Sequence, residues 1–165
     1  MKGYLNNRFV IVYDNNLKSK LINKGYGLKK EDSLELDLFE SFYLFEKKKI
    51  EIYYKDKKIN KDEFIKKIEK KIKNFQEKYL VYKDLKKDGY RVKDGAIFGF
   101  DFRVYEKETD KHTHTKFVVD VKSTHKDEMS KVIKSERLAN SINTKYVIAI
   151  VDFDKKITKI KLERI

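Results

Sequence analysis

The sequence predicts a mixed α/β (α+β) protein, in which a small α/β N-terminal part precedes a C-terminal part built on a mixed sheet. Three observations support this prediction. Apolar residues with helical spacing extend from Asn60 to about Leu80. Strand-like alternation of apolar and polar residues begins at Phe98. The run from Tyr146 to Val151 is apolar throughout, as in a strand that is covered on both faces.

The first 60 residues predict strands around one helix. Phe9 to Tyr13 is apolar and rich in strand-forming residues, and Asp14 to Asn16 is typical of a turn. Leu34 to Phe45 carries apolar residues at helical spacing, and Ile50 to Tyr54 indicates another strand.

The segment from Asn60 to about Leu80 predicts one long helix. Asn60 can cap its N-terminus, and Glu63 completes the capping-box pattern. One face of this helix is apolar, and its members are Phe64, Ile65, Ile68, Ile72, Phe75 and Tyr79. A short helix from about Lys78 to Lys86 follows, and Asp88-Gly89 ends it.

The C-terminal half predicts strands around one amphipathic helix. Phe98, Phe100, Phe102 and Val104 alternate as on one face of a strand. The next expected elements are a polar loop over 106–113, a strand over 117–121, a helix over 128–142, the buried strand over 146–151, a turn over 152–155 and a final strand that contains Thr158, Ile160 and Leu162. We therefore predict two domains, 1–76 and 77–165.

The composition suits two interpretations, a protein that binds polyanions or a lysine-rich surface that serves solubility or heat resistance. Forty lysines and arginines against 27 acidic residues give a net charge of +13, which attracts phosphate backbones. The chain has no cysteine, which excludes disulfides and thiolate metal sites. No apolar run reaches the roughly 18 residues that span a bilayer, and the N-terminus lacks the apolar core of a signal peptide. We expect a cytoplasmic protein with no membrane partner.

One set of residues suits metal-free cleavage of RNA, which carries its own nucleophile in the ribose 2′-hydroxyl. Such cleavage needs a general base, a general acid and a cation for the charge that develops on the phosphate. Tyr105 ends one predicted strand and His114 precedes the next, so a hairpin can bring both to one end of a sheet. A lysine just before the strand at Tyr146 can lie at the same end.

A second set of residues in the same segment matches a metal-dependent nuclease. Asp101, Asp120 and Lys122 fit the D…(D/E)-x-K pattern, in which two carboxylates hold Mg²⁺ and the lysine helps to activate water. Zinc is less suited, because the chain has no cysteine and His112 and His114 lack convincing partners. The residues alone leave the metal-free and the metal-dependent chemistry open.

Several motifs resemble the archaeal tRNA-splicing endonuclease family, from Phe9 to Asp152. They are R-F-V-I-V-Y-D (8–14), K-Y-L-V-Y-K-D-L (78–85), G-Y-R-V-K-D-G (89–95), G-F-D-F-R-V-Y (99–105) and Y-V-I-A-I-V-D (146–152). The resemblance implies an α/β N-terminal domain and a restriction-endonuclease-like C-terminal domain. It also implies cleavage of precursor tRNA, often at a bulge–helix–bulge, with no metal or other cofactor.

The resemblance implies catalytic residues as well. The family's tyrosine closes the D-F-R-x-Y motif and falls on Tyr105, and its histidine falls on His114. The family's lysine lies in A-x-S-V-R-K, but the run here is A-N-S-I-N-T-K. Read without a gap, this run puts Thr144 at the lysine position. We assign the role to Lys145, one residue later; the alternative is a structural subunit that binds RNA without cutting it.

The resemblance finally implies partner subunits of the same endonuclease, in a homotetramer or a heterotetramer. In the family, a short acidic loop docks into a neighbouring subunit. The corresponding stretch here is Ser123 to Ser130, which contains only Asp127 and Glu128 as acids. The final strand would pair across a subunit interface, which would cover an apolar edge.

Overall fold

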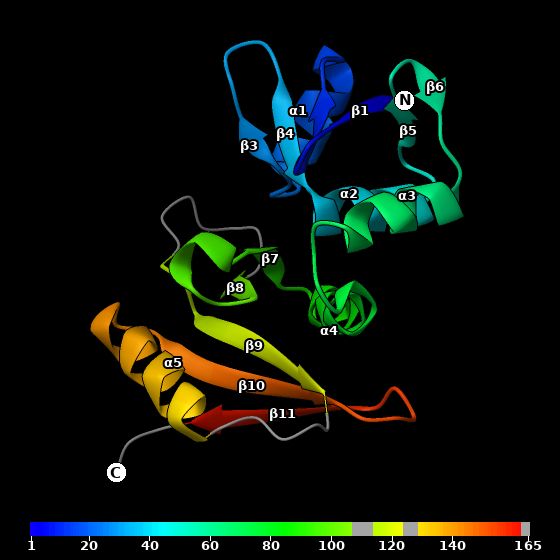
Figure 1. The fold of residues 1–165 in the computed structure, drawn as a ribbon. Coiled ribbons are helices and arrows are strands. Elements are labelled where there is room, and N and C mark those ends of the chain that lie inside the picture. Colours follow the sequence, from blue (N-terminus) through cyan, green and yellow to red (C-terminus); the bar gives the residue numbers. More distant parts are fainter. Residues whose placement is uncertain (107–113, 124–128, 163–165) are drawn as a thin grey trace. The chain divides into compact units, whose positions relative to one another are not determined.

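Two structural units make up the chain, Met1–Phe75 and Gln76–Ile165. The structure is a computed structural model, which describes residues 1–106, 114–123 and 129–162 (Figure 1). Each unit contains one sheet with both parallel and antiparallel strands. The predicted mixed α/β class is therefore confirmed. No helix in the described part of the chain is long and apolar enough to cross a membrane.

The N-terminal unit places helices against a six-stranded sheet of order β3-β4-β2-β1-β5-β6. Its elements are β1 (Lys2–Asn6), β2 (Phe9–Val12), α1 (Asn15–Asn23), β3 (Leu28–Lys29), β4 (Leu34–Asp37), α2 (Leu38–Glu46), β5 (Glu51–Tyr54), β6 (Lys57–Lys58) and α3 (Lys61–Glu69). Rings of Phe42, Phe64 and Phe75 meet in its core at centroid distances of 5.4–5.6 Å. The strands predicted over 9–13 and 50–54 are present with slightly shorter bounds. The turn predicted at 14–16 is wrong, because Asp14 caps helix α1 by accepting from the Leu17 amide at 2.6 Å.

The helix predicted over 34–45 is wrong in its first four residues. Leu34 and Leu36 are fully buried while Glu35 is only partly buried, an alternation that suits strand β4 paired with β2. Asp37 then caps α2: its side chain accepts from the Glu40 amide at 2.8 Å, and the Glu40 carboxylate accepts from the Asp37 amide. The strand therefore ends where the capping box begins.

The single long helix predicted from Asn60 to Leu80 is also wrong, because the structure contains two. Helix α3 begins with the predicted capping box of Asn60 and Glu63 and ends at Glu69. Helix α4 (Phe75–Lys87) follows a turn in which Asn74 adopts φ = 55°. Asparagine tolerates this left-handed backbone better than most residues. The apolar spacing continues through the turn, which hides the break from periodicity.

The C-terminal unit is built on a five-stranded sheet of order β11-β10-β9-β8-β7. Its elements are α4, β7 (Arg91–Asp94), the short 3₁₀ helix η1 (Ala96–Phe98), β8 (Phe102–Tyr105), β9 (Phe117–Ser123), α5 (Met129–Ser141), β10 (Lys145–Val151) and β11 (Ile157–Leu162). Strands β9 and β10 are parallel and are joined through α5, while all other neighbours are antiparallel.

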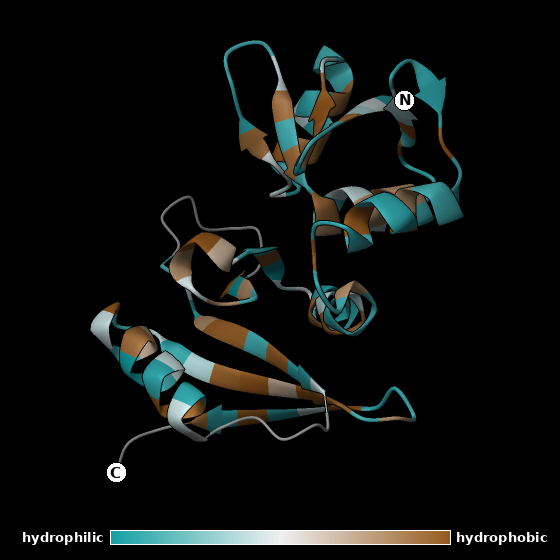
Figure 2. Cartoon of the chain, in the orientation of Figure 1, coloured by the Kyte–Doolittle hydropathy of each residue, from teal (hydrophilic) through white to brown (hydrophobic). Residues whose placement is uncertain are grey.

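Both faces of this sheet are covered, which explains the apolar run in β10. On one face α4 contacts β8, where the rings of Tyr82 and Phe102 lie 5.9 Å apart. On the other face Ala139 of α5 packs with Val118 and Tyr146. Figure 2 shows the hydrophobic residues along β9 and β10. The prediction of a strand buried on both faces is confirmed.

The strand alternation predicted from Phe98 to Val104 holds only from Phe102 onward. Residues 96–98 form η1, and Gly99 ends it with φ = 82°. Gly99 lies close to α5, because a Cβ at this position would be only 3.2 Å from Leu138 Cδ2. Phe98 consequently leaves the apolar face and remains 44% exposed.

Candidate active site at one end of the C-terminal sheet

Three strand ends meet at the same end of the five-stranded sheet. Strand β8 is antiparallel to β9, and β9 is parallel to β10. The last residues of β8 therefore lie beside the first residues of β9 and β10. The register places Val104, Phe117 and Lys145 in one row across these strands. This end carries all three residues that the sequence nominated for metal-free cleavage.

Tyr105 is the last residue of β8 and is partly buried. It pairs with Arg91 of β7, whose guanidinium carbon lies 4.9 Å from the centroid of the tyrosine ring. The guanidinium carbon of Arg103 lies 5.8 Å from the same centroid. The phenol ring thus has two permanent positive charges near it, both within the range of cation–π attraction.

His114 is exposed and lies three residues before β9. The segment around it is tied to the start of β10, because the Thr144 hydroxyl donates to the Thr115 carbonyl at 3.0 Å. This contact joins the His114 segment to the Lys145 strand at the sheet end. The two other histidines, His112 and His125, lie outside the described residues, as does the acidic pair Asp127 and Glu128.

Lys145 begins β10 and is exposed, whereas Thr144 is buried with 8% of its surface accessible. Lys145 of β10 lies in the same row as Val104 of β8, and Tyr105 follows Val104 in β8. Because successive side chains alternate, Tyr105 and Lys145 leave the sheet toward opposite faces. The register brings the two residues to one end of the sheet, and an amine at a strand terminus would have to bend around that end to reach the phenol.

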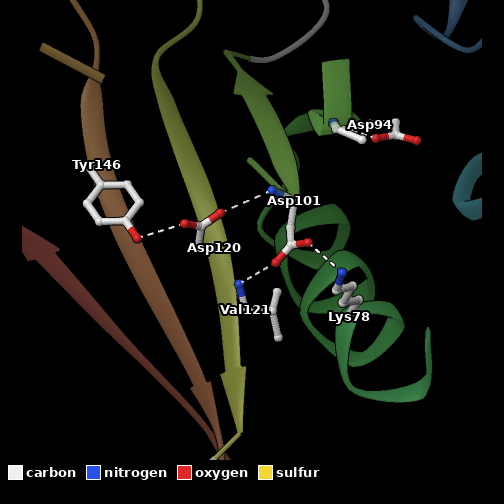
Figure 3. A network of polar contacts seen from close by, with 7 residues as sticks. Lys78, Asp94, Asp101, Asp120, Val121 and Tyr146 are labelled. Carbon is white, nitrogen blue, oxygen red and sulfur yellow. Dashed lines mark hydrogen bonds and ion pairs between the residues drawn. The ribbon is translucent and has the colours of Figure 1, made fainter. Parts of the chain in front are cut away.

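Asp101 and Asp120, the carboxylates of the metal-dependent hypothesis, lie side by side, with Asp120 buried and Asp101 partly exposed (Figure 3). Asp101 Oδ1 pairs with Lys78 Nζ at 2.6 Å, and its Oδ2 accepts from the Val121 amide at 2.8 Å. Asp120 Oδ1 accepts from the Asp101 amide at 3.2 Å, and its Oδ2 accepts from the Tyr146 hydroxyl at 2.8 Å. Every oxygen of the two carboxylates therefore has a donor from the protein.

Burial dominates the electrostatics of this pair. It raises the pKa of Asp120, since the Tyr146 hydrogen bond that favours the charged form is the weaker effect and the Asp101 charge adds repulsion. Burial and the neighbouring Asp120 also raise the pKa of Tyr146, which keeps its hydroxyl a proton donor. These groups connect α4, β8, β9 and β10. Within the described ranges, no three His, Cys, Asp or Glu residues are placed to hold a metal ion.

Sequence reasoning missed three residues of this region. Arg91 lies in the G-Y-R-V-K-D-G motif, and its pairing with Tyr105 follows only from the unpredicted strand β7. Lys78 and Tyr146 complete the carboxylate network from α4 and β10, far from Asp101 in sequence. The sequence did offer a signal for Tyr146: it is a tyrosine in an otherwise apolar strand, and a buried hydroxyl needs a hydrogen-bond partner.

Comparison with known proteins agrees with this architecture. Residues 1–65 match the family model of the tRNA intron endonuclease N-terminal domain, and residues 75–159 match that of the catalytic C-terminal domain. The tRNA-splicing endonuclease of Methanococcus vannielii is 38% identical over 91% of this chain and 86% of its own length. Those of Thermococcus kodakarensis (35%; 97% and 95%) and Pyrococcus horikoshii (35%; 86% and 82%) are similarly close. The chain therefore belongs to the tRNA intron endonuclease family and carries both its N-terminal and its catalytic C-terminal domain.

Proposed function

We propose that the chain cleaves precursor tRNA at exon–intron junctions with a bulge–helix–bulge, by attack of a ribose 2′-hydroxyl on the adjacent phosphate. The bond from the 2′-oxygen to phosphorus forms as the bond to the 5′-oxygen breaks. The products are a 2′,3′-cyclic phosphate and a 5′-hydroxyl. The observation that supports this best is the meeting of the Tyr105, His114 and Lys145 strand ends at one end of the catalytic domain's sheet.

Each residue has one role in this proposal. Tyr105 accepts the proton of the 2′-hydroxyl as general base, and His114 gives a proton to the leaving 5′-oxygen as general acid. Lys145 stabilises the negative charge that builds up on the phosphorane. The substrate supplies the nucleophile, so the step needs no metal ion and no other cofactor.

Replacement of His114 by Ala tests the proposal. We expect single-turnover cleavage of a bulge–helix–bulge transcript to slow by about 10²- to 10⁴-fold, while RNA affinity changes little. The matched controls are His112→Ala and His125→Ala, which should cleave at the unsubstituted rate. An equal loss of binding and cleavage in His114→Ala, or no loss of either, would contradict the assigned role.

The same assay in excess chelator addresses the metal-dependent alternative. Asp101 and Asp120 already accept hydrogen bonds or ion pairs at all four oxygens, so a metal ion would compete with protein donors for these oxygens. We expect cleavage to persist in chelator when monovalent salt maintains the RNA fold. The alternative would be favoured if chelator abolished cleavage, if added Mg²⁺ restored it, and if the Asp120→Asn variant did not cleave.

A non-catalytic, RNA-binding subunit is the second function that a specific observation favours. Thr144 is buried and bonded to Thr115, and Lys145 leaves the sheet on the face opposite Tyr105. Cleavage by the purified chain alone, reduced in Lys145→Ala, supports a complete active site. Cleavage only after a second endonuclease subunit is added, and unaffected by Lys145→Ala, supports the structural subunit.

We propose assembly with further endonuclease subunits, as a homotetramer or a heterotetramer. Strand β11 ends the sheet order β11-β10-β9-β8-β7 and pairs with β10 on one side. Its other side can extend the sheet into a neighbouring subunit, because an edge strand presents unpaired backbone groups.

A further inference from the structure

Phe98 is an exposed aromatic residue next to the proposed active site, and folding alone does not account for it. It lies at the end of η1 and is 44% exposed. Burial of a phenylalanine side chain in the core would stabilise the fold, because it removes a large apolar surface from water. Gly99 instead turns the backbone so that the loop lies against α5 and the Phe98 ring stays outside.

The second unusual feature is Arg103, whose guanidinium carbon lies only 4.1 Å from the centroid of the Phe98 ring. Its Nε is buried, and among the residues that the structure describes it has no hydrogen-bond partner. Such an atom costs stability, since it loses water without gaining an acceptor. Arg103 is therefore close to two aromatic rings, that of Phe98 and, at 5.8 Å, that of Tyr105.

These contacts produce an alternating row of rings and cations, Phe98–Arg103–Tyr105–Arg91, with spacings of 4.1, 5.8 and 4.9 Å. The distances of 4.1 and 5.8 Å from the Arg103 guanidinium carbon mean that the centroids of Phe98 and Tyr105 are at most about 10 Å apart. The row thus begins at an exposed ring and leads to the proposed general base.

We infer that Phe98, backed by Arg103, is a stacking platform for an unpaired base of the RNA, on a nucleotide close to the cleaved phosphate. Single-stranded RNA is recognised chiefly through splayed bases that stack on aromatic rings and guanidinium planes. The net charge of +13 and the two arginines of the row suit the phosphates that accompany such a base. The inference rests on the proposed function, because it takes its position from Tyr105.

The chain contains no tryptophan, so Phe98→Trp introduces a single fluorescent reporter on the platform. Phe153→Trp is the matched control: Phe153 is 82% exposed and follows the far end of β10, away from Tyr105. The RNA is a bulge–helix–bulge transcript with a 2′-deoxynucleotide at the junction, so that it binds without being cut. A mobility-shift assay records binding independently of fluorescence.

We expect this RNA to quench the tryptophan introduced at position 98 and to leave the one at position 153 unchanged. Transcripts with abasic unpaired nucleotides should remove the quenching. Phe98→Ala should weaken binding of the intact transcript by about 5- to 100-fold, the range for loss of one base stack, and should weaken binding of the abasic transcript no further.

Three results would overturn the inference: bound RNA without quenching at position 98, quenching that abasic RNA retains, or fluorescence that changes with protein concentration before RNA is added. The last would show that a second copy of the chain covers the ring. Failure of the proposed function is recognised separately. It would appear as cleavage of the 2′-deoxy junction, or as an all-ribose transcript left uncut by the unsubstituted chain, whatever the fluorescence shows.

Discussion

At the scale of single residues, the catalytic domain separates two polar groups with different uses. Tyr105 and His114 lie at the sheet end, one partly buried and one exposed. Asp101 and Asp120 lie between strands and are bonded at every oxygen. The first group suits chemistry, and the second stabilises the strands that position it.

The raised pKa of Asp120 predicts a pH-dependent stability. The folded protein binds this proton more tightly than the unfolded chain, whose carboxyl keeps a pKa near 3.8. Ionisation of Asp120 therefore lowers the free energy of unfolding as pH rises from about 4 through the folded-state pKa. Asp120→Asn lacks this ionisation.

We expect the unfolding free energy of the wild type, minus that of Asp120→Asn, to fall between pH 4 and pH 7 in urea titrations. Glu106→Gln serves as control, because Glu106 is exposed and pairs with Lys116 at the surface. A difference that rises with pH would mean that hydrogen bonds to the Asp120 carboxylate outweigh its burial.

At the scale of elements, some local signals were recognised from the sequence, while the helix caps at Asp14 and Asp37 were not. The capping box at Asn60 and the strands over 117–121 and 146–151 are present. Helix α1 was missed because its first residues resemble a turn. The other wrong predictions lie where the chain changes direction without changing its apolar spacing: β4 before Asp37, the turn at Asn74, and η1 before Gly99. Periodicity carries no information about such turns, because tertiary pairing decides them.

The Asn60 cap gives a prediction at this scale. Its side chain accepts from the Glu63 amide at 2.9 Å, and the Glu63 carboxylate accepts from the Asn60 amide at 2.9 Å. Asn60→Ala should lower the free energy of unfolding by about 1 kcal/mol, measured by urea denaturation. Asn60→Asp retains an acceptor and should stay within a few tenths of the wild type; an equal loss in both variants would exclude capping as the cause.

At the scale of the whole molecule, the family, the mixed α/β class and the endonuclease activity were all predictable, because motifs spread over most of the chain carry them. The pairing of distant residues was not. Nothing in the sequence links Lys78 to Asp101 or Tyr146 to Asp120, since these contacts depend on which strands become neighbours. For the same reason, the sequence did not reveal that Lys145 and Tyr105 leave opposite faces of the sheet.

The net charge of +13 predicts steep salt dependence of RNA binding. Each phosphate contact releases counterions, so six to ten contacts weaken binding by about 10³- to 10⁵-fold between 50 and 200 mM salt. We expect filter-binding titrations of the precursor to follow this trend, and Phe98→Ala to shift the affinity at every salt concentration without changing the slope. A shallow slope would mean that few phosphates are contacted.

The parallel pairing of β9 with β10 has a consequence for when the protein becomes able to cut. These two strands meet only after the α5 crossover has closed, so the segment that bears His114 gains its neighbour from residues more than twenty positions later in the chain. On the proposed mechanism, a chain whose crossover is still open carries charge that attracts RNA but has no assembled active site. Cleavage is therefore possible only after this part of the sheet has folded.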